Sequence, residues 1–160
     1  NTGHNFSNLT HELQNNTYSV VHIATHGVFG GSAEKTFLLL YDDKLNMNQL
    51  SQLIEYNNYK NNRVELLTLS ACQTALGDER AALGLAGVAV KAGVKSVIAT
   101  LWFVDDEATS LAIQEFYRQW RNSKISKIQA LQNAQKMLIS IRRYSHPAYW
   151  APFLLIGNWL

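Results

Sequence analysis

The fold of this chain is decided by an apolar run that ends on its single cysteine, Val64-Glu65-Leu66-Leu67-Thr68-Leu69-Ser70-Ala71-Cys72-Gln73-Thr74. A similar run upstream ends on a histidine, Val20-Val21-His22-Ile23-Ala24-Thr25-His26-Gly27. Apolar, β-branched runs of this length predict strands that are buried on both faces of a parallel sheet. Neighbouring parallel strands bring their carboxyl ends to one edge, where open α/β sheets build their sites. We therefore expect Cys72 and His26 to meet at that edge.

Composition sets limits on the function. The chain has 160 residues, enough for one domain with one core, and 47% of them are hydrophobic. The net charge of +2 is too small to indicate binding to nucleic acid or to an anionic membrane, and no run of Lys or Arg forms a basic patch. No apolar stretch has the roughly 18 residues of a membrane span. One cysteine forms no internal disulfide, which favours a reducing, cytoplasmic location.

The remaining segments alternate between strand and helix patterns. We expect helices at 7–15, 48–56, 83–92, 105–120 and 126–141, strands at 18–24, 64–70, 94–102 and 153–157, and a hairpin over 36–47 that turns at Asp42-Asp43. Gly93 is expected to end the third helix as a C-terminal cap. The last helix is expected to bury a stripe that includes Ile128, Leu131 and Leu138. This alternation predicts an α/β fold with helices on both faces of a largely parallel sheet.

A cysteine paired with a histidine can become a thiolate nucleophile, as a cysteine peptidase requires. The plainer interpretation of Cys72 is a small buried hydrophobic residue. His22 lies about 13 Å from His26 along a strand, too far to share a metal ion, and is interpreted as a hydrogen-bonded core histidine. A thiol phosphatase would need an arginine where Asp78 stands. No phosphate-binding glycine loop or cysteine zinc cluster is present, so no metal or cofactor is expected.

These motifs identify a family. The chain closely resembles the CHAT domain, a caspase-like module often fused to TPR repeats. The matching stretches keep the family order and span almost all of residues 18–157: His22–Gly27, Leu69–Gly77, Ala92–Trp102, Val104–Thr109 and His146–Gly157. The caspase spacing of a histidine about 50 residues before the cysteine also agrees. The caspase Gln-Ala-Cys-x-Gly signature is half present, as Ser-Ala-Cys-Gln-Thr.

The resemblance implies a caspase-like three-layer α/β/α sandwich with a mainly parallel central sheet. Residues 1–160 would form a single domain, a C-terminal fragment of a longer cytoplasmic protein with upstream TPR repeats. The implied activity is cleavage of a protein substrate, with Cys72 as nucleophile and His26 as general acid/base. The backbone N–H groups of Cys72 and Gly27 would form the oxyanion hole.

The resemblance also indicates a specificity. The stretch Trp102-Phe103-Val104-Asp105-Asp106-Glu107 is similar to the Trp-x-Val-x-Asp stretch of separase, where an acidic residue receives the arginine before the cleaved bond. The matching residue is Asp106, with Asp105 and Trp102 as further substrate-binding candidates. The plainer interpretation is that Asp105 or Asp106 caps the following helix. We expect cleavage after Arg or Lys.

Two further expectations remain open. The alternative to a peptidase is a catalytically silent scaffold or interaction domain, because fold does not fix function. Members of the family usually have another strand before the point that corresponds to Asn1. Without that strand the sheet would have an exposed edge, and self-association through this edge is expected.

Overall fold

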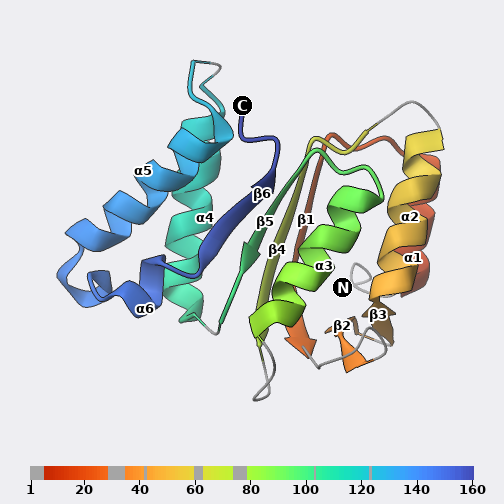
Figure 1. The fold of residues 1–160 in the computed structure, drawn as a ribbon, viewed down its shortest axis with the longest axis horizontal. Helices are drawn as coiled ribbons and strands as arrows, with labels where there is room; N and C mark the ends of the chain where they lie inside the picture. The colour runs from red at the N-terminus through yellow and green to blue at the C-terminus, as the bar shows by residue number, and fades with distance from the viewer. Residues whose placement is uncertain are drawn as a thin grey trace.

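The computed structural model of the chain describes residues 6–28, 35–41, 43–59, 63–73, 79–102, 104–122 and 124–160, and only the backbone of residues 57–59, 71–73 and 79–82. A mixed sheet runs through the molecule with helices on both sides (Figure 1). The elements follow one another as α1 (Phe6–Asn15), β1 (Val20–Val28), β2 (Phe37–Leu39), β3 (Lys44–Asn46), α2 (Met47–Tyr59), β4 (Leu66–Gln73), α3 (Glu79–Lys91), β5 (Ser96–Thr100), α4 (Asp106–Trp120), α5 (Lys127–Ser140), the 3₁₀ turn η2 (Arg142–Tyr144), α6 (Pro147–Trp150) and β6 (Phe153–Gly157).

The sheet has six strands in the order β3-β2-β1-β4-β5-β6. Its centre, β1-β4-β5, is parallel, whereas β2 pairs antiparallel with both β1 and β3, and β6 pairs antiparallel with β5. The expected hairpin is confirmed as β2 and β3, and the residue Asp42 at its turn lies outside the described residues. The predicted α/β class, with a parallel centre between two helical layers, is confirmed.

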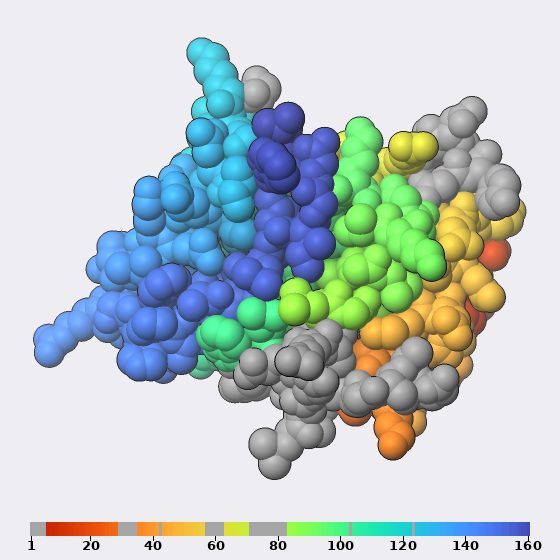
Figure 2. Space-filling model, in the orientation of Figure 1, coloured from red at the N-terminus to blue at the C-terminus, as the bar shows by residue number. Residues whose placement is uncertain are grey.

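Two hydrophobic clusters occupy the two sides of the sheet. Helices α1, α2 and α3 cover one face, where Ile23, Leu67, Leu69, Val97 and Ala99 point, and α4 and α5 cover the other, where Leu66, Ile98 and Phe153 point. Every residue of β5 is buried, because β5 lies between two strands and under helices on both faces. In the space-filling view β6, dark blue, reaches the surface between α5 and α3 (Figure 2).

Local signals fix several element ends. Asp105 accepts a hydrogen bond from the Ala108 backbone N–H at 3.0 Å and so caps α4, which confirms the prediction of a cap there. Ser126 caps α5 in a capping box with Gln129. Gly93 follows α3 with φ of 108°, the left-handed conformation that the predicted glycine cap requires. The short helix α6 was not expected from the hydrophobic pattern, which is too brief there to show a period.

The two strands that carry the candidate dyad are longer than predicted. β1 continues to Val28 and β4 to Gln73, so Gly27 and Cys72 lie inside strands, not in loops after them. The expectation that β1 is buried on both faces is wrong. Its residues His22, Ala24 and His26 are exposed, because the helices on that side cover β4, β5 and β6 and leave the β1 face open.

The predicted stripe of α5 needs one correction as well. Leu131 and Leu138 are buried, but Ile128 is 43% exposed, and its neighbour Lys127 is buried instead. The Lys127 ammonium lies 2.7 Å from a carboxylate oxygen of Glu65 and also donates to the Leu160 carbonyl. A pattern of apolar residues cannot indicate this position, because the side chain that turns inward is charged.

Candidate functional site

The sheet register places the two dyad candidates beside each other. His26 of β1 is the Cα partner of Cys72 of β4, near the carboxyl ends of both strands. Neighbouring strands lie about 4.8 Å apart, so the two backbones approach closely at this level. Gly27 is the next residue and pairs with Gln73 on one side and with Leu38 of β2 on the other. The Cys72 side chain lies outside the described part of the structure.

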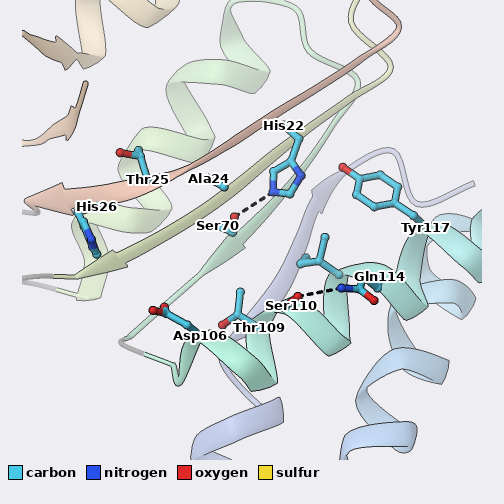
Figure 3. Close-up of a pocket in the computed structure, with 11 residues that line it drawn as sticks. His22, Ala24, Thr25, His26, Ser70, Asp106, Thr109, Ser110, Gln114 and Tyr117 are labelled. Atoms are coloured by element: carbon cyan, nitrogen blue, oxygen red, sulfur yellow. Dashed lines mark hydrogen bonds between the residues drawn. The ribbon is translucent and has the colours of Figure 1, made fainter. Parts of the chain in front are cut away.

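A pocket of about 470 Å³ opens between helix α4 and the exposed face of β1 (Figure 3). We call it the α4–β1 pocket. Two strands and one helix line it, with His22, Ala24, Thr25 and His26 from β1, Ser70 from β4, and Asp106, Thr109, Ser110, Ile113, Gln114 and Tyr117 from α4. His26 and Asp106 lie toward one end, which we call the outer end, and His22 and Tyr117 lie toward the other, the inner end (Figure 3).

Hydrogen bonds and ring contacts organise the inner end. His22 Nε2 and Ser70 Oγ are 2.9 Å apart and share a hydrogen bond. The ring centroids of His22 and Tyr117 are 5.9 Å apart, and the Tyr117 hydroxyl shares a 2.9 Å hydrogen bond with Thr68. His22 is exposed at the open face, yet neighbouring groups shield part of its ring from water. This desolvation lowers the pKa of the imidazole below its ordinary value.

The three specificity candidates have different surroundings. Asp106 is exposed and lines the α4–β1 pocket, on the same turn of helix as the cap. Asp105 uses its carboxylate to cap α4. Trp102 donates its indole N–H to the Ala148 carbonyl of α6 at 3.1 Å and is absent from the pocket lining. The structure therefore brings Asp106 together with His26 at one pocket and holds Asp105 and Trp102 in contacts with the backbone.

The outer edge of β1 borders a second hollow of about 540 Å³. It is lined by residues 22–26 of β1 together with Leu9 of α1, Leu39 at the end of β2, and Leu40 and Tyr41 after it. Within the described residues β2 pairs only with Gly27 and Val28 of β1, so the strand has no ladder partner on this side from Val20 to His26. Tyr41 is 92% exposed beside it.

Sequence reasoning missed most of the pocket. The sequence pattern predicts a core histidine at position 22 and indicates no role for four further residues, although all five line the pocket: His22, Ser70, Ser110, Gln114 and Tyr117. The signal was present in the spacing. Residues 22, 24 and 26 share one face of a strand, and residues 106, 110, 113, 114 and 117 follow a helical period. What the spacing did not indicate is that these two faces are opposite each other.

The structure gives two further findings of absence. Among the described residues, no three or more His, Cys, Asp or Glu side chains come together as metal ligands would. No helix in the part of the chain that the structure describes combines the length and the apolar character needed to cross a membrane.

The six-stranded sheet, with its parallel centre between two helical layers, is that of a caspase-like α/β domain. The chain belongs to the CHAT domain family, whose model matches residues 2–158, and this family is part of a caspase-like clan of peptidases. Tetratricopeptide repeat protein 28 of Mus musculus is 33% identical over 97 residues, and its Homo sapiens counterpart is 32% identical over 97 residues. Each match covers 59% of this chain and 4% of the relative.

Proposed function

We propose that this chain is a caspase-like cysteine endopeptidase in which Cys72 is the nucleophile and His26 the general acid/base. The observation that carries the proposal is the register, in which these two residues are partners on adjacent parallel strands at the edge where α/β sheets build sites. A free thiol is mostly protonated at neutral pH and needs a base to react. His26, exposed one strand away, is the group that would serve as that base.

The proposed reaction has two stages. His26 takes the thiol proton, and the sulfur attacks the carbonyl carbon of the scissile peptide bond. The backbone N–H groups of Cys72 and Gly27 are assigned to the resulting oxyanion. The imidazolium then gives its proton to the leaving amine as the C–N bond breaks, which leaves a thioester. His26 next deprotonates a water molecule that attacks the thioester carbon. The C–S bond breaks, the carboxylic acid product leaves, and the imidazolium returns its proton to the sulfur.

The proposed substrate is a protein cut after Arg or Lys. The support is Asp106, the one carboxylate among the described residues that line the pocket beside His26. A carboxylate there would pair with a guanidinium or ammonium group. Asp105 and Trp102 would act by holding the Asp106 turn in place through the cap and the contact with α6.

The proposed setting is a longer polypeptide in the cytoplasm with TPR repeats before this domain. Both relatives are named as tetratricopeptide repeat proteins, which supports the repeats, and the single cysteine supports a reducing compartment. In the alternative, the domain is a scaffold without activity, and its thiol would then react as an ordinary one.

Alkylation and cleavage test the proposal together. Cys72 is the only cysteine, so the iodoacetamide reaction rate against pH reports this thiol alone. We expect fast alkylation near neutral pH that slows in His26→Ala, and peptide cleavage that falls more than about a thousandfold in either Cys72→Ala or His26→Ala, with little further loss in the double variant. His11→Ala, an exposed histidine on α1, is the matched control. Wild-type turnover in either single variant would remove the dyad assignment.

A further inference from the structure

The α4–β1 pocket is longer than one side chain requires. His22 and His26 are four residues apart on a strand, or about 13 Å, and Asp106 and Tyr117 are eleven residues apart on α4, or about 16 Å. Thirteen ångströms is the span of about four residues of extended peptide. A basic side chain paired with Asp106 at the outer end would therefore leave the inner end for another part of the same ligand.

The two ends differ in chemistry. Asp106 gives the outer end a carboxylate, whereas the inner end is built from the His22 and Tyr117 rings, Ser70 and Gln114 (Figure 3). No Lys or Arg is among the described residues that line the pocket, so a carboxylate brought to the inner end would find no cationic partner of that kind. A second cation there would lie far from Asp106. Burying either charge unpaired is costly.

The inner end suits an aromatic ring. The rings of His22 and Tyr117 are inclined at 47° and both line the pocket, so a ligand ring placed there would pack edge-on or offset against either of them. Ile113 adds an apolar wall, because it is buried where α4 faces the pocket. Ser70 Oγ and the Gln114 amide supply hydrogen-bonding atoms next to these rings. Gln114 donates to Ser110 at 2.9 Å, so its side chain is oriented along the helix.

We propose that the inner end of the α4–β1 pocket is a second specificity subsite, in which His22, Gln114 and Tyr117 accept a neutral aromatic side chain lying within about four residues of the basic one. The inference rests on the proposed function for the basic residue at the outer end. It adds a specificity that the acidic residue alone does not give, because the peptide must carry both groups at the right separation.

Binding to the Cys72→Ala chain tests the subsite without cleavage. Fluorescent peptides with one fixed arginine and a tyrosine, phenylalanine, alanine, lysine or glutamate at each of the four positions on either side would be titrated by anisotropy. We expect one position at which tyrosine or phenylalanine binds about tenfold more tightly than alanine, and lysine or glutamate no better than alanine. His22→Ala and Gln114→Ala should abolish this advantage and keep the arginine preference. Asp106→Ala should abolish the arginine preference and keep the aromatic advantage.

Matched controls are His11→Ala and Gln132→Ala, which change exposed residues on α1 and α5 and should leave both preferences intact. Equal affinity for the aromatic and alanine peptides at every position would overturn the subsite, as would failure of all peptides to bind. These results leave the dyad to be judged by alkylation and cleavage. An aromatic preference that persists in His22→Ala and Gln114→Ala would also overturn the proposed subsite. Aromatic binding with an inert thiol would support the subsite and remove the peptidase.

Discussion

The Glu65→Gln substitution should destabilise the fold by leaving a buried lysine without its carboxylate. Lys127 Nζ lies 2.7 Å from Glu65 Oε1, and its side chain is 2% exposed. Lys95 binds the other oxygen of the same carboxylate at 2.6 Å, but its side chain is 46% exposed. One carboxylate therefore joins a buried cation and an exposed one. Substituting each lysine in turn compares a buried ion pair with an exposed one at the same carboxylate.

Burial sets the magnitude. Removing one partner of a buried ion pair costs about 3–5 kcal/mol, because the other charge is left uncompensated. Lys127 keeps the Asn158 and Leu160 carbonyls as acceptors, so we expect about 3 kcal/mol for Glu65→Gln, at the lower end of that range. Lys95→Met should cost less than about 1 kcal/mol, as exposed pairs do. Lys127→Met removes the charge and keeps the volume, so Glu65→Gln combined with Lys127→Met should recover about 2 kcal/mol of the loss.

Urea unfolding followed by tryptophan fluorescence at pH 7 measures these differences. A loss of about 3 kcal/mol corresponds to a Tm lower by about 6–12 °C in a chain of this size. Burial alone raises the pKa of the Glu65 carboxyl, but the two lysines outweigh burial and leave that pKa below its ordinary value. The ionised Glu65 carboxylate therefore adds its full contribution to the free energy of unfolding above the unfolded-state pKa of about 4.3. This contribution is lost as pH falls through the lower folded-state pKa. A double variant no more stable than Glu65→Gln would refute this reasoning.

Three other predictions concern two glycines, the titration of His22 and the edge of β1. Gly157 has φ of 101° and a Cβ added there would overlap the Lys95 carbonyl, so Gly157→Ala should cost at least about 2 kcal/mol in urea unfolding. Gly87→Ala, whose new Cβ would have no heavy atom within 4 Å beyond the neighbouring backbone of its own helix, should be neutral or stabilising. Desolvation lowers the pKa of His22, so unfolding takes up a proton below about pH 6.5 and stability falls there. Tyr117 of α4 and Ser70 of β4 face His22, and Asp106 lies toward the other end of the pocket. We therefore expect His22→Gln to flatten the dependence of stability on pH. An unchanged dependence would show that another group is responsible. Among the described residues, β1 has no ladder partner on its outer edge from Val20 to His26, so we expect concentration-dependent association in sedimentation experiments. A monomer at every concentration would contradict this prediction.

The sequence predicted the kinds and order of the long elements because each carries its own periodic signal. The α4 and α5 patterns are strong enough that their predicted bounds agree with the structure within one residue, and the predicted cap of α4 is confirmed at Asp105. The strand ends were harder to place. No continuous apolar signal covers the last residues of these strands, which include Thr25, His26, Ala71 and Cys72. They extend β1 and β4 because each strand has the other as its ladder partner.

The sequence by itself determined that this chain is an α/β domain, that a histidine and a cysteine follow two apolar runs, and that their motifs match one family. These properties depend on neighbours along the chain. Only the tertiary structure decided that His26 is the register partner of Cys72, that α4 leaves one face of β1 open, and that Lys127 rather than Ile128 turns inward. The register of the strands, the covering of the sheet by helices and the Glu65–Lys127 ion pair all depend on segments 40 or more residues apart. Their contacts form only when the sheet and its helices pack together.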